Sequence, residues 1–515
     1  MAEETHGSPT AATTAGPVRG LTEDGVHVFR GIRYGADTAT TRFAAPRPPD
    51  GWTEVRDAVD YASSAPQAAP VDVRLFRSWR PNPPPPTSED CLFLNVWTPG
   101  LRDGAGRPVM VWLHGGGFVS GSGSSYAYDG VRLAKRGGVV VVTVNHRLNV
   151  FGHLYLAELG SQFADSGNAG VLDLVLALRW VRDNAAEFGG DPGNVTIFGE
   201  SGGGGKVSVL MAMDAASGLF HRGVVQSGPW LRVTPAEDAA AQARAVVDQL
   251  GLAPTDVDQI RTVPVERIRD AATRAVQGGA ALAGTGPVLD GHNIDRHPFD
   301  PDGPPQSRDV PLMIGTCRTE TSLLAGAARR ELFDLTWETL PQQLASTLRG
   351  QDADEIVAGY RELYPERDPV DAYFTITTDR GFYATSAREA DRKAAQDGAP
   401  AYFYILDWNT PVDGGKWRCP HALDIGFVFD NVAKSESMCG SGPDQQRLAD
   451  LMSEAWLAFA RTGDPNHPLL PDWPAYAAPD RPTMIFDVAP RVVNDPRGAD
   501  RALFRRRPTA EPVRS

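Results

Sequence analysis

Five short apolar runs along the chain are typical of strands that lie inside a sheet. They are residues 108–113, 138–144, 195–198, 311–316 and 401–406. The second run is β-branched almost throughout, which favours a strand buried on both faces of a mainly parallel sheet. Because a parallel sheet needs helices to cover it, the pattern predicts an α/β fold with a large, mostly parallel central sheet flanked by helices.

The segments between and after these strands predict helices. One amphipathic helix is predicted by four apolar residues that recur on a single helical face: Val171, Leu174, Val175 and Leu178. Alternating alanine-rich and charged stretches predict further helices within 235–285 and 334–348. Pro341 must begin or break a helix in the second of these segments.

The remaining segments predict one large domain with short ends. Residues 17–32 hold two apolar runs separated by Gly and Asp, which predict an N-terminal hairpin. Residues 61–90 are rich in proline and predict a surface loop. In a chain of 515 residues we expect a single domain over 15–498, with flexible tails at 1–14 and 499–515.

Composition and charge narrow the classes of protein to which the chain can belong. A hydrophobic fraction of 42% and a charged fraction of 22% are ordinary for a globular protein. The formal net charge of −14 argues against nucleic acid, which binds basic surfaces. We find no secretory leader and no run of about 18 apolar residues, so we expect no membrane insertion. Only four cysteines occur, which indicates the reducing cytoplasm.

A serine flanked by glycines follows the apolar run at 195–198. The order strand, Gly199-x-Ser201-x-Gly203, helix is the pattern of a nucleophile elbow, in which a tight turn exposes the serine hydroxyl. A chain with 53 glycines matches this short pattern by chance, and the alternative is an ordinary glycine-rich turn. Its place between a strand and a helix favours Ser201 as a catalytic nucleophile.

A second glycine run follows the strand at 108–113. His114 to Phe118 includes three consecutive glycines, which allow backbone N–H groups to converge on one point. Acyl transfer needs such donors where the carbonyl oxygen becomes an oxyanion. We therefore predict the N–H groups of Gly116, Gly117 and Gly202 as oxyanion-hole donors. The alternative is a phosphate-binding loop, but the run lacks the Gly-Lys-Ser/Thr ending of that motif.

Several motifs in one order resemble those of the type-B carboxylesterases, the family of cholinesterases and bacterial para-nitrobenzyl esterases. The motifs are residues 88–96, 114–118, 188–201 and 218–228. The resemblance covers most of the chain. It implies the α/β-hydrolase fold, with helical insertions that cap the active site. It also implies that Glu200 and Phe118 line that site.

The order of catalytic residues in α/β-hydrolases is serine, acid, histidine, so the two partners must follow Ser201. Of the histidines after Ser201, only His421 and His467 come late enough in the chain for an acid that follows a later strand to precede them. His467 lies in a polar turn. His421 follows the run at 401–406, which we interpret as the last major strand. The family match also indicates His421.

The acid has two candidates, one on each of two successive strands. Glu320 follows the strand at 311–316 and matches the family's acid. Asp407 ends the next strand and is the alternative, although it lies on the same connection as His421. A carboxylate in this role orients the imidazole and stabilises its charged form. We predict the triad Ser201, Glu320 and His421.

The sequence therefore predicts a serine carboxylesterase that hydrolyses neutral esters through an acyl-enzyme, with no metal and no cofactor. The expected partner is a small-molecule ester, and we expect a monomer or weak homo-oligomer. One alternative is a non-catalytic module of the same superfamily, and another is a lipase that acts on long-chain lipid esters.

Two positions depart from the pattern that the resemblance implies. Ala65 stands where secreted relatives have the disulfide partner of Cys91, so we expect Cys91 to be a free, buried thiol. Lys206 stands five residues after the serine, where the family has a small residue, and the sequence indicates no role for it.

Overall fold

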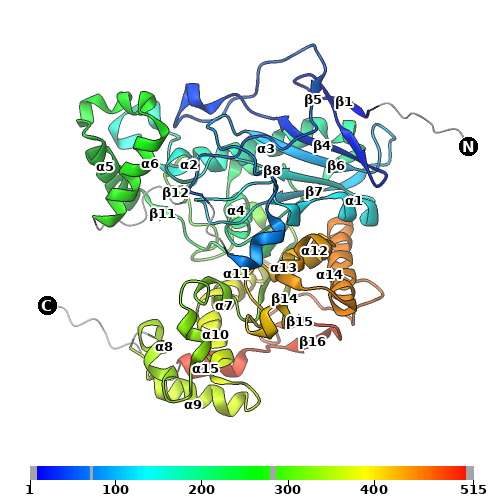
Figure 1. Ribbon diagram of the computed structural model, residues 1–515, viewed down its shortest axis with the longest axis vertical. Helices are drawn as coiled ribbons and strands as arrows, with labels where there is room; N and C mark the ends of the chain where they lie inside the picture. Colours follow the sequence, from blue (N-terminus) through cyan, green and yellow to red (C-terminus); the bar gives the residue numbers. More distant parts are fainter. Residues whose placement is uncertain (1–7, 70–72, 279–285, 349, 506–515) are drawn as a thin grey trace, which may run out of the picture.

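The computed structural model describes residues 8–69, 73–278, 286–348 and 350–505 (Figure 1). Within them, eleven strands form one sheet in the order β16-β15-β14-β13-β10-β9-β7-β8-β6-β4-β3. The strands are β3 (Leu21–Glu23), β4 (Val26–Arg33), β6 (Phe93–Thr98), β7 (Arg107–Leu113), β8 (Val140–Val144), β9 (Gly190–Glu200), β10 (Arg222–Gln226), β13 (Leu312–Cys317), β14 (Ala401–Leu406), β15 (Pro482–Phe486) and β16 (Arg491–Asn494).

The middle of the sheet is parallel and its edges are antiparallel. In the stretch β15-β14-β13-β10-β9-β7-β8, each strand pairs in parallel with the next. Strands β6, β4, β3 and β16 run antiparallel to their neighbours. The large, mostly parallel sheet is therefore confirmed. The interpretation of 401–406 as the last major strand is wrong, because β15 follows it. That strand is short and begins with a proline, so its apolar pattern is weak.

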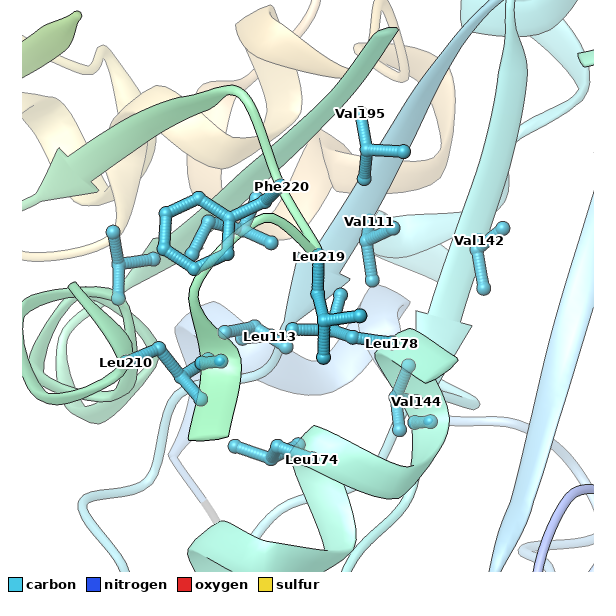
Figure 2. Packing of buried hydrophobic residues seen from close by; sticks show 14 of the residues in the cluster. Val111, Leu113, Val142, Val144, Leu174, Leu178, Val195, Leu210, Leu219 and Phe220 are labelled. Atoms are coloured by element: carbon cyan, nitrogen blue, oxygen red, sulfur yellow. The ribbon is translucent and has the colours of Figure 1, made fainter. Parts of the chain in front are cut away.

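Alternate residues of the central strands point to opposite faces of the sheet, and each face packs in its own hydrophobic core. One face packs on α3 (Ala169–Asn184) and α4 (Gly202–Leu210), and the other on α1 (Val131–Gly137), α12 (Leu423–Val428) and α14 (Pro443–Thr462). Figure 2 shows the first core, in which strand residues meet helix residues: Val111, Leu113, Val142, Val144, Leu174 and Leu178. A strand apolar on both faces thus has a helix layer on each side, as its sequence predicts.

Helical insertions extend the molecule beyond this sandwich (Figure 1). Helices α5 (Ala236–Leu250) and α6 (Val265–Gln277) pack on each other after β10, and the rest of their predicted segment, 279–285, lies outside the described residues. A second group follows β13 and comprises α7 (Thr321–Leu324), α8 (Leu340–Leu348), α9 (Ala353–Leu363), α10 (Pro369–Thr378), a π-helical turn (Asp379–Tyr383) and α11 (Ala384–Ala394). Pro341 lies in the first turn of α8, where its missing N–H costs nothing.

The ends differ from the predicted tails. Thr10–Ala12 forms β1, which pairs with β2 (Pro17–Arg19) in a small separate sheet, because its three small residues suffice for a short ladder. The N-terminal hairpin consists of β3 and β4 instead. Gly498–Arg505 forms α15, and residues 1–7 and 506–515 lie outside the described part. No helix among the described residues is long and apolar enough to cross a bilayer.

Candidate active site

Ser201 lies on the turn between β9 and α4. Its backbone has φ 57° and ψ −125°, a conformation that is strained for any residue with a side chain. Close packing enforces the turn, since a Cβ on Gly203 would lie 2.0 Å from the carbonyl oxygen of Leu113, and one on Gly228 only 1.8 Å from that of Ser201. The Ser201 N–H donates to the carbonyl of Gln226 at 2.8 Å. The strand, strained serine and helix have the geometry of a nucleophile elbow.

His421 and Glu320 meet beside this turn, although 101 residues separate them along the chain. Each follows the carboxyl end of a strand, β14 and β13 respectively, and these strands are neighbours in the sheet. The His421 Nδ1 lies 2.6 Å from Glu320 Oε2. The other oxygen, Oε1, accepts a 2.7 Å hydrogen bond from the Cys317 N–H. Both carboxylate oxygens are therefore held, and the imidazole plane is fixed by a buried partner.

The alternative acid and the alternative histidine lie elsewhere. Asp407 accepts from Arg318, with 2.6 Å between Oδ1 and Nε, and its N–H donates to the Phe486 carbonyl. His467 is half-buried and its Nε2 lies 3.1 Å from the Leu451 carbonyl oxygen. Neither residue contacts the imidazole of His421 in the described structure.

The second imidazole nitrogen of His421 faces Glu200. The Nε2 atom lies 3.1 Å from Glu200 Oε1, and both side chains are buried. Within the described residues no hydrogen bond joins Nε2 to the Ser201 hydroxyl. Catalytic hydrogen bonds are often long before substrate binds, and tighten in the complex. Glu200 thus contacts the nitrogen that would accept the serine proton.

Burial and paired charges shift the pKa values of these groups in one direction. Burial disfavours the imidazolium of His421, but the carboxylates of Glu200 and Glu320 outweigh it and raise its pKa above the ordinary 6.5. Burial raises the pKa of Glu200 above 4.5, against the effect of His421. Burial also raises the pKa of Asp424 to about 6. His421 therefore keeps its proton to a higher pH than an isolated imidazole would.

The predicted oxyanion loop lies against the N-terminus of α4. Gly116 and Gly117 have φ values of 87° and 65°, which side chains rarely adopt. Their N–H groups donate to no other group of the described chain. A Cβ on Gly202 would lie 2.2 Å from the Gly117 carbonyl oxygen, so the loop and the helix start are in close contact. Gly116 is exposed and Ser201 is half-exposed, which leaves this point open to solvent.

Phe118 differs from its predicted place on the surface of the site. It is only 1% exposed, and its ring packs edge-on against Trp230 at 5.1 Å and His153 at 5.4 Å. The ring therefore lies under the loop. The Phe382 ring, from the π-helical turn in the second insertion, lies 5.2 Å from the His421 ring.

Sequence reasoning missed Trp230, Phe382 and Asp424. Asp424 accepts from the Tyr404 hydroxyl at 2.8 Å and from the Gln226 amide at 3.0 Å. Trp230 lies in a loop and Phe382 in the short π-helical turn, where no apolar period marks either residue. Asp424 could have been found from the sequence, because it follows His421 by only three residues. It is buried on α12.

The described residues hold no cluster of three or more His, Cys, Asp or Glu that could bind a metal ion. A cavity of about 310 Å³ lies between α11 and α15, away from the triad. The arginines that line it include Arg481, Arg497 and Arg501, each of which pairs with an aspartate. These charges serve the packing of α15.

An open parallel sheet with a strained serine at a strand-to-helix turn defines the α/β-hydrolase class. The family model of the carboxylesterase family matches residues 7–503. The para-nitrobenzyl esterase of Bacillus subtilis (strain 168) is 36% identical over 499 residues, which are 95% of this chain and 97% of that protein. The phenmedipham hydrolase of Pseudarthrobacter oxydans is 34% identical over 500 residues, with the same coverage.

Solved structures agree with these relatives. A carboxylesterase of Geobacillus stearothermophilus, solved at pH 6.2, has a TM-score of 0.81 and 37% identity, and covers 96% of this chain and 99% of its own. An esterase from Clostridium hathewayi, described as hydrolysing aliphatic aromatic polyesters, has a TM-score of 0.81 and 34% identity, and covers 96% and 97%. The chain belongs to the carboxylesterase family and is a carboxylic-ester hydrolase.

Proposed function

We propose that Ser201, His421 and Glu320 form the catalytic triad of this esterase. His421 Nε2 removes the hydroxyl proton of Ser201, and the serine oxygen attacks the ester carbonyl. His421 then gives that proton to the departing alcohol, and an acyl-enzyme remains. Water, deprotonated by His421, attacks the acyl-enzyme, and His421 returns the proton to the Ser201 oxygen as the acid is released. Glu320 keeps the proton on Nδ1 and stabilises the charged imidazole.

The N–H groups of Gly116, Gly117 and Gly202 complete this proposal as the oxyanion hole. Their support is the close contact between the glycine loop and α4, and the lack of a partner for the loop N–H groups within the described chain. Gly202 begins a helix, whose N-terminal dipole favours negative charge. The single observation that carries the proposal is the 2.6 Å contact between His421 and Glu320 beside the strained Ser201.

The proposed substrates are neutral, soluble carboxylic esters of small size. The formal net charge of −14 disfavours the approach of an anionic substrate. Trp230 and Phe382 add apolar surface beside Phe118 and His421. We propose that alcohol or acyl groups of modest apolar size bind along these rings, which gives contact without a charged partner.

A substrate panel tests this proposal. Soluble p-nitrophenyl acetate and butyrate, and emulsified long-chain triglyceride, are offered to the purified enzyme and to Ser201→Ala. We expect hydrolysis of the soluble esters by the native chain, and a loss of at least about 10⁴-fold in kcat for the variant. Preferential hydrolysis of the emulsion would instead indicate a lipase. Absence of any hydrolysis, with no labelling by a fluorophosphonate, would indicate a non-catalytic module.

We also propose that the enzyme works in the cytoplasm as a monomer or weak homo-oligomer. The four cysteines Cys91, Cys317, Cys419 and Cys439 are all free and buried, which suits a reducing compartment. Cell fractionation tests the first part, with enzyme in the periplasm or medium as the contrary result. Sedimentation velocity over a range of protein concentrations tests the second, and a tight oligomer at the lowest concentration would contradict it.

A further inference from the structure

A fully buried lysine lies directly behind the glycine loop. Lys206, on the first turns of α4, has no exposed surface. Its Nζ donates to the carbonyl oxygen of His114 at 2.8 Å and to that of Gly117 at 2.9 Å. It also lies 5.1 Å from the centre of the Phe118 ring. The amine therefore touches the first and the fourth residue of the His114–Phe118 loop and the ring beneath it.

We propose that Lys206 is a positioning residue for the oxyanion hole, which it holds in shape by binding both ends of the glycine run. This inference rests on the proposed roles of Gly116 and Gly117. Neither glycine pairs with a strand, and the Gly116 carbonyl accepts from groups of the loop itself, the N–H groups of Val119 and Ser120 and the Ser120 hydroxyl. Free glycine populates many backbone conformations. Two hydrogen bonds from one rigidly buried amine restrict the segment at both ends. Oxyanion stabilisation depends on donors that are in place before the charge develops.

The connection of Lys206 to the chemistry is direct along the chain. Lys206 lies on the helix whose first residue, Gly202, supplies the third proposed donor, and Ser201 immediately precedes that helix. The lysine therefore ties two N–H donors from the loop to the one donor on the helix. The distance between the two groups of donors is set by the extended length of one side chain and its two hydrogen bonds.

Burial of the Lys206 amine costs stability, so a lysine is a poor choice for this position if the side chain only fills space. Burial lowers its pKa to about 7, although Glu200 acts in the opposite direction. Burial, together with the charge of Lys206, lowers the pKa values of His114, His146 and His153 well below 6.5. The three rings stay uncharged near neutral pH. Since an unpaired buried ammonium is strongly destabilising, the hydrogen bonds to the two carbonyls offset part of the cost of burying Lys206.

The chain contains a matched control for a buried lysine without this role. Lys393, on α11, also has no exposed surface, and its Nζ donates to the carbonyl oxygens of Ser307 and Arg308 at 2.9 and 2.8 Å. Both lysines hold backbone carbonyls, but those of Lys393 belong to a loop that contributes nothing to the proposed site. Lys393 also donates to Gln396 Oε1 at 3.2 Å. Replacement of either lysine by methionine removes two hydrogen bonds to backbone carbonyls and keeps a similar volume.

The test compares Lys206→Met with Lys393→Met in the full-length enzyme. We expect both to lower the Tm. Only Lys206→Met should lower kcat, by about 10- to 100-fold with KM changed by less than about 3-fold. It should also weaken inhibition by a trifluoromethyl ketone, whose hemiketal oxyanion mimics the tetrahedral intermediate, by a similar factor. If Lys206→Met keeps native kcat and ketone affinity while its Tm falls as in Lys393→Met, the proposal is overturned.

A second variant covers a failure of Lys206→Met to fold. Lys206→Gln keeps an N–H donor on a side chain one methylene shorter, so we expect an intermediate loss of kcat and of ketone affinity. Native values for both would overturn the proposal. Fluorophosphonate labelling of the native enzyme distinguishes a failure of the proposed esterase function from a failure of the proposed role of Lys206. If the native enzyme is not labelled, the proposed function fails, and if it is labelled but both variants behave like native enzyme, only the role of Lys206 fails.

Discussion

The Nε2 atom of His421 lies 3.1 Å from Oε1 of Glu200, the residue directly before the candidate nucleophile. Because Nδ1 of the same ring is bound to Glu320, the imidazole lies between two carboxylates. Two negative neighbours favour the protonated ring. We therefore predict that Glu200 shifts the pH at which His421, the proposed general base, becomes able to accept the proton of Ser201.

The first prediction concerns the pH dependence of kcat/KM for a neutral ester. The general base works only when deprotonated, so a raised pKa moves the loss of activity to higher pH. For the native enzyme, kcat/KM should rise with pH through a midpoint above about 6.5. Glu200→Gln removes one of the two charges that stabilise the imidazolium, and its midpoint should fall by about 1 unit or more. Initial rates between pH 4.5 and 10 measure both.

A matched control for this prediction is Glu389→Gln. Glu389 is also a buried glutamate, and burial raises its pKa to about 8, but its contact is the Ser208 hydroxyl at 3.0 Å. Its replacement should leave the midpoint unchanged. A Glu200→Gln profile that coincides with the native one would show that Glu200 does not control the imidazole.

The second prediction separates the two candidate acids. Glu320→Gln should lower kcat by about 10⁴-fold, because glutamine neither fixes the same tautomer nor stabilises the imidazolium. Asp407→Asn should leave kcat within about 3-fold of native and lower the Tm, because it weakens an ion pair with the buried Arg318. Steady-state kinetics and thermal unfolding of both variants decide. A larger kinetic loss in the Asp407 variant would refute Glu320 as the acid.

The third prediction concerns the contact between the helix start and the glycine loop. In Gly202→Ala the new Cβ would lie 2.2 Å from the Gly117 carbonyl oxygen, so the loop must move away from α4. We expect kcat to fall by about 10- to 100-fold. Gly223→Ala, on β10, instead places its Cβ 3.1 Å from Met211 Sδ and 3.2 Å from Val207 Cγ1, so it presses on α4 without meeting the loop. It should keep kcat per folded molecule, and equal losses in both variants would place the effect in the helix.

The sequence predicted most of the sheet because buried parallel strands are apolar on both faces. The run at 138–144 is such a strand, and the structure has β8 there. By contrast, β15 is short and begins at a proline, and β1 has three small residues, so neither shows a clear period. Local composition carries little information where pairing with a neighbour decides the structure.

The candidate site could be predicted only where the chain carries a motif. Ser201 and the glycine loop have such motifs, whereas Glu320 was distinguished from Asp407 by the family's pattern. The contact of Glu200 with His421 Nε2 and the position of Phe382 beside the ring arise from packing between distant segments. The sequence showed that Lys206 departs from the small residue of the family's pattern. Its two carbonyl partners could not be predicted, because they depend on how α4 approaches the loop.

The most direct test of the account is the identity of the residue that becomes covalently modified. Diethyl p-nitrophenyl phosphate, a neutral organophosphate, is mixed with the native enzyme and with Ser201→Ala. We predict release of one p-nitrophenolate per native chain, parallel loss of esterase activity, and a diethylphosphoryl group on the peptide that contains Ser201 by mass spectrometry. The variant should release none. Modification of another residue with loss of activity, or full labelling of Ser201→Ala, would contradict the assignment of Ser201 as the nucleophile.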